Sequence, residues 1–319
     1  MGALAEIGEQ LIKLSGGLRE VVLPFLGLHA ARQNAGFAVG GDVTFEIDET
    51  AEAYLAAYMA RELPGWAYYS EDRGLQGAAQ PELVLVVDPI DGTRPAAAGF
   101  EAACVSVAAV PPLPMPTMGD VVAGVVQELK SGDLFWACKG DGFGMRRADG
   151  GDIPFLPTPR RDLEGLFWTL GFRGRPALVL AGVLAELIDT SSVRGAMFDI
   201  GSATYSVTRL LTGQLDAYVD IGPAIIAAHP ETEGEFRRVG LGAVLCNSPY
   251  DLAAVHLICR EAGLPIGDAD GSPLDHRPVL GSDASYQLAC IAAGNDELQE
   301  LLVEAVQRGL EGYRMVPRR

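Results

Sequence analysis

The chain has 319 residues, enough for one large α/β unit or roughly two domains, and its 49% hydrophobic and 21% charged residues are typical of a globular protein. Its 24 basic and 42 acidic residues give a formal net charge of -18, spread along the chain rather than gathered in a tail. This excess of acid argues against binding to a nucleic-acid polymer, and a phosphorylated substrate would need bound cations for attraction.

The N-terminus and the cysteines predict a cytoplasmic protein. Residues 1–16 carry Glu6 and Glu9 within a helical apolar pattern, and they lack the basic start and apolar core of a secretory signal. No stretch reaches the roughly 18 uninterrupted apolar residues of a membrane-spanning helix, so no membrane partner is expected. The five cysteines are scattered without a CxxC spacing, and we expect them to be reduced.

In chain order, the first half of the sequence predicts helices around a group of short strands. Apolar residues at helical spacing predict a helix or helix pair over residues 3–31, and the glycines that follow predict a mobile loop over residues 33–41. Asp48 opens a segment of strong helix propensity that runs to Met59. Enrichment in β-branched and aromatic residues predicts strands over 66–70, 83–87, 102–110, 121–128 and 133–139.

The second half alternates short apolar runs with helical patterns, which is typical of an α/β region. The turn residues 149–152 predict a boundary. We therefore expect an N-terminal α+β region over residues 1–150 and a C-terminal α/β region over residues 151–319. Helices are expected over 176–189, 203–212, 252–262 and 295–310.

The most informative motif is Asp88-Pro89-Ile90-Asp91-Gly92-Thr93, which directly follows the apolar run 83–87. A buried strand that ends in two carboxylates delivers hard oxygen ligands to the edge of a sheet. The glycine and threonine that follow add backbone N–H groups that can hold an anion. The motif therefore predicts a metal-dependent phosphate site.

Two more acidic residues lie at the ends of predicted elements. Glu71 follows the predicted strand 66–70, and Asp251 stands at the N-cap of an apolar helix that Gly263 closes. Taken alone, Asp251 is more simply a helix cap. Taken with Asp88 and Asp91, the two acids predict a carboxylate cluster of the kind that Mg²⁺ prefers, without any histidine or cysteine.

Several short segments then occur in a recognisable order along the chain: residues 41–48, 70–72, 88–93, 201–203 and 250–254, with smaller ones at 139–142, 215–218, 260–263 and 291–295. In this order they resemble the motifs of the inositol monophosphatase family, whose relatives are Mg²⁺-dependent, lithium-sensitive phosphatases. The resemblance covers most of the chain. It implies an α+β fold with alternating αβαβα layers, the sugar-phosphatase fold, with most metal ligands in the N-terminal region and Asp251 in the C-terminal region.

The resemblance also implies how the matching acids are shared among the metal sites. Glu71, Asp88 and the carbonyl oxygen of Ile90 match one site, and Asp88, Asp91 and Asp251 match a second, so that Asp88 bridges the two. A third, weaker site would use Glu71. Two or three Mg²⁺ ions are therefore expected, with Mn²⁺ as a possible substitute.

The catalytic and substrate-binding candidates follow from the same match. Asp48 and Thr93 match the pair that orients and deprotonates the attacking water, and Glu71 joins them through the third metal. The backbone N–H groups of Gly92 and Thr93 match a phosphate cradle. The remaining substrate-binding candidates are Arg94, Gly201, Ser202 and Ala203. None of the four histidines matches a position with a chemical role, and we expect them to be structural or surface residues: His29, His229, His256 and His276.

The implied function is hydrolysis of a small-molecule phosphate ester by direct attack of a metal-activated water, in a homodimer. The glycine-rich loop over residues 33–41 resembles archaeal members that combine inositol monophosphatase with fructose-1,6-bisphosphatase activity, which favours a phosphorylated sugar or inositol. Two alternatives stay open. One is a bisphosphate nucleotidase, and the other is a non-catalytic family member that acts as a binding or regulatory protein.

The chain departs from the family pattern in several places, and two of these matter most for the function. Arg94, Pro95 and Ala96 follow Asp-Gly-Thr where the family commonly has an asparagine and an aromatic residue. Arg94 either contacts a second anionic group of the substrate or pairs with a surface acid. Residues 219–249 form a longer connection than usual. It can be interpreted as a lid, as an interface element or as an ordinary excursion of the chain, and we favour the last interpretation.

Overall fold

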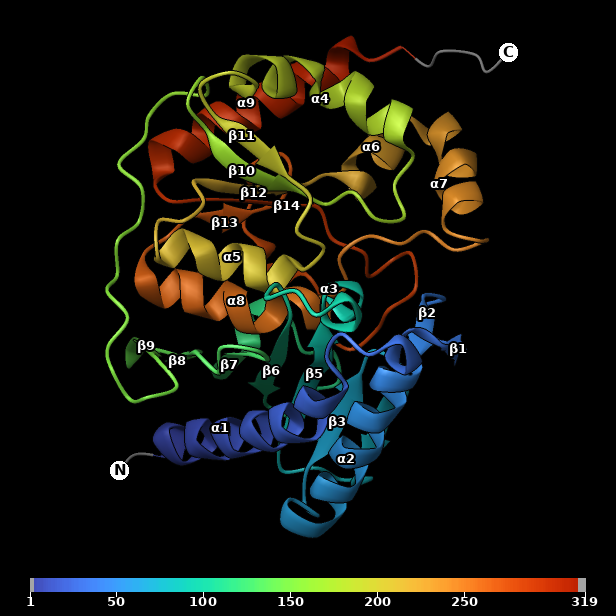
Figure 1. Ribbon diagram of the computed structural model, residues 1–319, viewed down its shortest axis with the longest axis vertical. Helices are drawn as coiled ribbons and strands as arrows, with labels where there is room; N and C mark the ends of the chain where they lie inside the picture. The colour runs from blue at the N-terminus through green and yellow to red at the C-terminus, as the bar shows by residue number, and fades with distance from the viewer. Residues whose placement is uncertain (1–2, 315–319) are drawn as a thin grey trace.

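The computed structural model describes residues 3–314, which form five alternating layers of helices and sheets (Figure 1). Helices α1 (Ala3–Val22) and α2 (Glu46–Glu62) form one outer layer, and helices α4 (Ala177–Ser191) and α9 (Asp296–Gly312) form the other. Two sheets lie inside them, with a central layer of helices between the sheets. The predicted α+β fold with αβαβα layers is confirmed.

The first sheet has seven strands in the order β4-β3-β5-β6-β7-β8-β9. Only the β3–β5 pair is parallel among the pairings that the described residues make in this sheet. Its strands are β3 (Ala67–Ser70), β4 (Gly74–Gly77), β5 (Val84–Asp91), β6 (Cys104–Val110), β7 (Ala123–Glu128), β8 (Leu134–Cys138) and β9 (Gly142–Arg146). Four of them lie within the predicted strand ranges, and β5 continues beyond its range to Asp91.

Strand β5 is buried along its whole length because helices cover both faces of the sheet. Leu85 and Val87 belong to the apolar cluster that α1 and α2 complete, and Val84 and Val86 belong to the cluster on the opposite face. Side chains of a strand alternate between the two faces, so a continuous apolar run is what a strand covered on both sides requires. This burial fixes the position of the polar residues at its end.

The second sheet has five strands in the order β11-β10-β12-β14-β13. They are β10 (Phe167–Leu170), β11 (Ala196–Phe198), β12 (Ala217–Asp220), β13 (Ile266–Gly267) and β14 (Cys290–Ala293). The connection over residues 219–249 leaves β12 and forms two short helices, α6 (Gly222–Ala228) and α7 (Glu233–Val239), which lie beside the layers (Figure 1).

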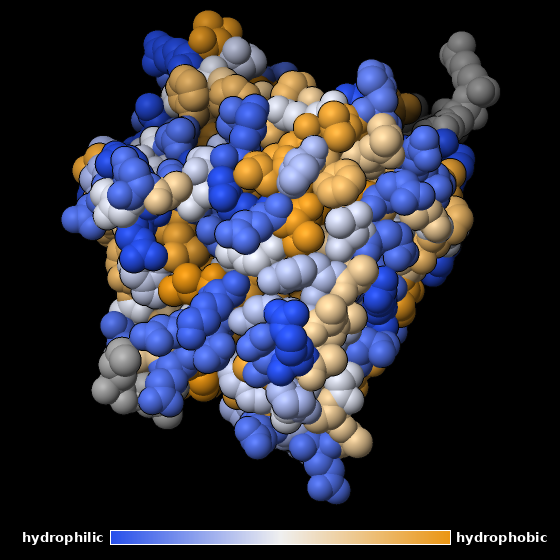
Figure 2. Space-filling view, turned by 60° about the horizontal axis from the view of Figure 1, so that its bottom comes forward, coloured by the Kyte–Doolittle hydropathy of each residue, from blue (hydrophilic) through white to orange (hydrophobic). Residues whose placement is uncertain are grey.

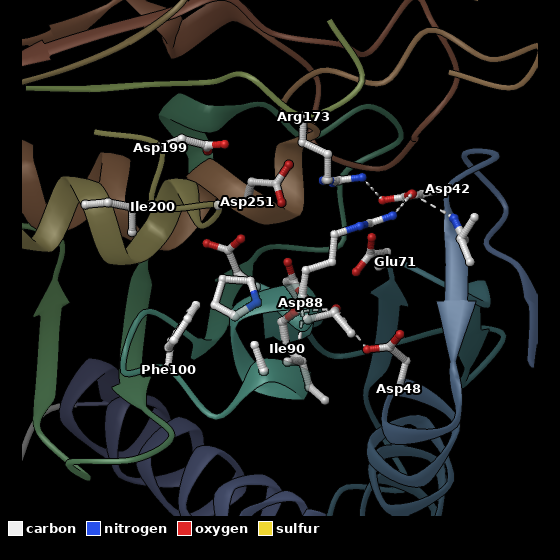
Figure 3. Close-up of a pocket in the computed structure, with 18 of the residues that line it drawn as sticks. Asp42, Asp48, Glu71, Asp88, Ile90, Phe100, Arg173, Asp199, Ile200 and Asp251 are labelled. Atoms are coloured by element: carbon white, nitrogen blue, oxygen red, sulfur yellow. Dashed lines mark hydrogen bonds and ion pairs between the residues drawn. The ribbon is translucent and has the colours of Figure 1, made fainter. Parts of the chain in front are cut away.

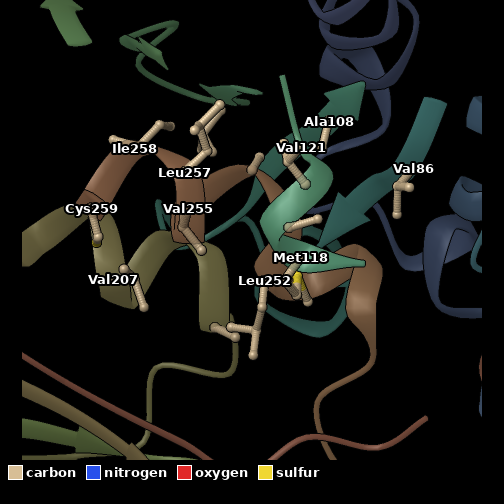
Figure 4. Packing of buried hydrophobic residues seen from close by; sticks show 14 of the residues in the cluster. Val86, Ala108, Met118, Val121, Val207, Leu252, Val255, Leu257, Ile258 and Cys259 are labelled. Carbon is tan, nitrogen blue, oxygen red and sulfur yellow. The ribbon is translucent and has the colours of Figure 1, made fainter. Parts of the chain in front are cut away.

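Helices α5 (Ala203–Leu211) and α8 (Pro249–Ala262) form the central layer and share one apolar core with both sheets. In Figure 4, Val255 of α8 lies on the side that faces Val207 of α5, whereas Leu257 and Ile258 point to the opposite side of the same helix. Burying each such side chain contributes about 1.5–3 kcal/mol. Helices α5 and α8 come after residue 150 in the sequence, but they pack against the first sheet, whose strands come before it. The division into regions 1–150 and 151–319 therefore stays a prediction.

One local prediction is wrong, and a second is confirmed over only part of its range. The expected loop over residues 33–41 contains strand β1 (Asn34–Phe37), which pairs antiparallel with β2 (Val43–Phe45). The N-terminal helix ends at Val22, and two 3-10 turns follow at Leu23–Phe25 and His29–Arg32 instead of a second α-helix. Pro24 lies in the first of these turns and cannot supply the backbone N–H that a continuing helix needs.

The surface is polar and mixed. Figure 2 shows hydrophilic residues interspersed with smaller apolar groups over the face that it presents. Among residues 3–314, no helix combines the length and the apolar character that crossing a membrane would require.

Candidate active site

The end of strand β5 carries the two central acids of the site. Asp88 pairs with Ser106 of β6 and Asp91 pairs with Cys104, so three steps along β5 oppose two along β6. Such a β-bulge changes the direction in which side chains point at the end of a strand. The Asp88 Oδ1 atom then accepts the backbone N–H of Ile90 at 2.9 Å, which fixes its carboxylate beside the Ile90 carbonyl.

Gly92 makes the sharp turn from β5 into helix α3 (Thr93–Ala98). Its backbone has φ +91°, a left-handed conformation that glycine adopts without strain. A Cβ atom here would lie 2.5 Å from the carbonyl oxygen of Ala102 and 2.9 Å from the Ser202 Cβ. The glycine therefore allows the close approach of β5, β6 and the start of α5 around the acids.

Three carboxylates converge at this point. Oxygen atoms of Asp88, Asp91 and Asp251 all lie within 4.8 Å of one another. The Asp91 Oδ2 atom accepts hydrogen bonds from the Ser202 Oγ at 2.7 Å and from the Thr204 backbone N–H at 2.6 Å. The start of helix α5 thus holds Asp91 in place.

Asp251 does not occupy the N-cap of helix α8, as the sequence pattern suggested. Ser248 is the N-cap, and Asp251 is the third helical residue, whose Oδ2 atom accepts the Ser248 backbone N–H at 2.5 Å. This reciprocal arrangement is a capping box. Gly263 ends the helix in a left-handed conformation, as predicted.

Burial and, after it, mutual repulsion dominate the electrostatics of these acids. Burial and the neighbouring carboxylates raise the pKa of Asp88 and of Glu71 well above the ordinary carboxylate range. Burial, followed by the charge of Asp91, raises the pKa of Asp251 to about 8. A group of buried carboxylates without enough positive charge is a site that cations stabilise.

The donor set fits hard divalent cations. The carboxylates of Glu71, Asp88, Asp91 and Asp251 and the Ile90 residue all line one cavity, and no histidine or cysteine is among the lining residues in the described part of the chain. Oxygen ligands without nitrogen or sulfur favour Mg²⁺, Mn²⁺ or Ca²⁺ over zinc or copper.

Asp48 and Thr93 form a hydrogen-bonded pair on the cavity wall. The Thr93 Oγ1 atom lies 3.0 Å from the Asp48 Oδ1 and 3.1 Å from the Ile90 carbonyl oxygen. The Asp48 Oδ2 accepts the Phe45 backbone N–H at 2.8 Å, near the start of helix α2. Burial raises the pKa of Asp48 to about 7, although both hydrogen bonds favour its charged form.

The cavity itself has a volume of about 470 Å³ and lies between α3, the β1–β2 segment and the start of α8 (Figure 3). It brings together most of the residues that the sequence singled out. Those that line it are Asp48, Glu71, Asp88, Ile90, Asp91, Gly92, Thr93, Arg94, Gly201 and Asp251. Ser202 and Ala203 instead line a smaller adjacent cavity of about 50 Å³, where Ser202 contacts Asp91 rather than the open space.

Sequence reasoning missed four charged residues of the cavity wall: Asp42, Asp72, Arg173 and Asp199. Asp42 pairs with Arg94 at 3.4 Å and with Arg173 at a shorter distance. Arg94 therefore pairs with an acid that is largely buried, not with a surface acid. Asp42 lay within the recognised segment 41–48, whereas nothing in the sequence around Arg173 marked it.

Comparison with known proteins agrees with this geometry. The model of the inositol monophosphatase family matches residues 10–311. The chain belongs to the inositol monophosphatase family. Members of this family are phosphatases that generally use divalent metal ions.

Individual relatives of this inositol monophosphatase family member are distant but span most of its length. A fructose-1,6-bisphosphatase/inositol-1-monophosphatase from Methanothermobacter thermautotrophicus is 24% identical over 303 residues, which are 93% of this chain and 95% of the relative. The Nus factor SuhB of Xylella fastidiosa is 25% identical over 282 residues, 87% of this chain and 86% of the relative. The structure of an inositol monophosphatase from Anabaena superposes with a TM-score of 0.67 at 18% identity, covering 96% of this chain and 97% of the other.

Proposed function

We propose that this protein is a Mg²⁺-dependent phosphomonoesterase that hydrolyses a small phosphorylated sugar or inositol. The observation that carries the proposal is the convergence of the Asp88, Asp91 and Asp251 carboxylates beside the Thr93–Asp48 pair in one cavity. Cations and an activated water are the two requirements of phosphate-ester hydrolysis without a covalent intermediate.

The metal ligands are assigned as the family match implies. Glu71, Asp88 and the Ile90 carbonyl would hold one ion, and Asp88, Asp91 and Asp251 would hold the second, with a third, weaker site at Glu71. When bound, the cations lower the pKa of water and offset the negative charge of the phosphate. Mn²⁺ is expected to replace Mg²⁺ because both accept octahedral oxygen ligation.

Thr93 and Asp48 are assigned to position and deprotonate the attacking water. The Thr93 hydroxyl can accept a proton from that water while it donates its own to the Asp48 Oδ1, 3.0 Å away. Asp48 accepts this proton with little cost near neutral pH because burial raises its pKa to about 7. The backbone N–H groups of Gly92 and Thr93 are assigned to the phosphate oxygens.

The remaining assignments concern the whole protein. We propose that Arg94 and Gly201 contact the part of the substrate that is not hydrolysed. We propose that Ser202 holds Asp91 in place and that Ala203, the first residue of helix α5, belongs to the same support. A cytoplasmic homodimer inhibited by lithium is the expected state, as for the family.

A substrate panel tests the function. Release of inorganic phosphate is measured from myo-inositol 1-phosphate, fructose 1,6-bisphosphate and adenosine 3′,5′-bisphosphate, with Mg²⁺ or Mn²⁺ and with or without lithium. Turnover of the first two supports the proposal. Preference for the third would make the protein a bisphosphate nucleotidase, and no turnover of any ester would leave the non-catalytic binding role.

A further inference from the structure

Three charged side chains on the cavity wall come from distant parts of the chain. Asp42 precedes strand β2, Arg94 lies in helix α3, and Arg173 follows strand β10 in the second sheet. Arg173 donates to the Asp42 Oδ2 and Arg94 lies 3.4 Å from the Asp42 Oδ1, so that one carboxylate holds both guanidinium groups. Figure 3 shows Arg173 pointing toward Asp42 on the side of the cavity where Glu71 lies.

The two guanidinium groups carry more positive charge than Asp42 can offset. Two arginines and one aspartate sum to a net charge of about +1, and Glu71 is the other acid whose charge acts on both guanidinium groups. Each guanidinium has five N–H donors, and its hydrogen bond to Asp42 uses one of them. Donors therefore remain for an anion that enters the cavity.

Both arginines are accessible from the cavity and restrained in position. Their side chains are 41% and 38% exposed, whereas that of Asp42 is 12% exposed. Arg94 also lies over the ring of Phe45, with its guanidinium carbon 5.3 Å from the ring centroid. A pair of held but accessible guanidinium groups is suited to bidentate binding of an oxyanion.

The size of the cavity leaves room for such a second group. Its volume of about 470 Å³ lies in the range of roughly 300–1,000 Å³ that is typical of sites for whole small molecules. The carboxylate cluster would bind the phosphate that is hydrolysed. Arg94 follows Thr93 in helix α3, and Arg173 follows strand β10. Neither guanidinium group can serve as an oxygen ligand of a metal ion, so their N–H donors are left for another part of the same substrate.

We propose that Arg94 and Arg173, held together by Asp42, bind a second phosphate of the substrate, so that the protein prefers bisphosphorylated to monophosphorylated esters. This inference rests on the proposed phosphatase function. It assigns selection of the substrate to residues outside the metal-binding cluster.

The test compares substrates that differ only in the second phosphate. Values of kcat and KM are measured with Mg²⁺ for fructose 1,6-bisphosphate and fructose 1-phosphate, and for adenosine 3′,5′-bisphosphate and adenosine 3′-monophosphate. For the pair that is turned over, we expect the wild-type protein to favour the bisphosphate at least tenfold in kcat/KM. Arg94→Gln and Arg173→Gln should each reduce this preference at least fivefold, mainly through the KM of the bisphosphate.

Two further variants separate binding from folding. Arg94→Lys keeps the charge but loses the bidentate fork, so it should retain part of the preference. Arg308→Gln removes an exposed arginine of α9 that pairs with Glu186 on the surface, and it should leave the preference unchanged. Melting temperatures of all variants identify any loss of folding.

The outcomes distinguish this inference from the phosphatase function. If monoesters are hydrolysed but the arginine variants impair both members of a pair equally, the inference fails and the phosphatase function stands. If no ester is hydrolysed, isothermal titration with fructose 1,6-bisphosphate and fructose 1-phosphate still measures the second-phosphate preference directly. Equal affinity of the wild-type protein for the two ligands would overturn the inference.

Discussion

Asp251 should destabilise the metal-free protein at neutral pH. Its carboxylate lies with those of Asp88 and Asp91 within 4.8 Å, and burial raises its pKa to about 8. The pKa of an unfolded aspartate is about 3.9. Between these values the folded protein binds a proton that the unfolded chain does not, so stability falls as the pH rises through this window. At about 1.4 kcal/mol per pH unit, the cost at pH 7 is at most about 4 kcal/mol.

Substitution of Asp251 by asparagine should remove this cost. Asparagine keeps the size of the side chain, and its carbonyl oxygen can still accept the Ser248 N–H of the capping box. We expect metal-stripped Asp251→Asn to be more stable than the wild-type protein by about 1–4 kcal/mol at pH 7 and equal to it within about 0.5 kcal/mol at pH 4.

Urea unfolding in EDTA at the two pH values measures this difference. Asp141→Asn is a matched control because Asp141 is exposed and lies outside the cavity, so its substitution should change neither value. An Asp251→Asn protein that is less stable than the wild type at pH 7 would refute the argument that burial and carboxylate repulsion destabilise the metal-stripped protein.

Three further predictions concern the roles of single residues. Thr93→Val removes the hydroxyl that contacts Asp48, and it should lower kcat about 100-fold with little change in KM. An unchanged kcat would show that Thr93 takes no part in the proton transfer. Ser202→Ala removes one of the two hydrogen-bond donors to Asp91 and should weaken Mn²⁺ binding, measured by isothermal titration, about tenfold. An unchanged Mn²⁺ affinity would show that the Thr204 N–H alone is enough to hold Asp91. Mg²⁺ should raise the melting temperature of the wild-type protein at pH 8 by several degrees but that of Asp88→Asn much less, and an equal rise would place the ions elsewhere.

The sequence predicted the elements whose pattern is local and strong. The run Val84–Val87 is apolar on both faces because helices cover both faces of its sheet, and the acids that follow it could be placed at a sheet edge. The recognised motifs also identified most of the cavity wall, since each lies at the end of one strand or the start of one helix.

Other features needed the structure because they arise from long-range contacts. Asp42 and Arg173 are 131 positions apart, and no periodicity relates them. Strand β1 exists because β2 offers a partner, although its residues Asn34–Phe37 have weak strand propensity. The capping box at Ser248 was readable in principle, because a serine followed three residues later by an acid is a known helix start.

The most direct test of the account is phosphate release in the presence of Mg²⁺ by the wild-type protein and by Asp88→Asn. Asp88 is assigned to both metal sites, so its loss removes a ligand from each. We predict steady release of phosphate from at least one small phosphate ester by the wild-type protein, none after chelation of the metal, and a loss of at least 100-fold in Asp88→Asn. Release that persists in EDTA or in the folded Asp88→Asn variant would contradict the assignment of this cavity as a metal-dependent phosphatase site.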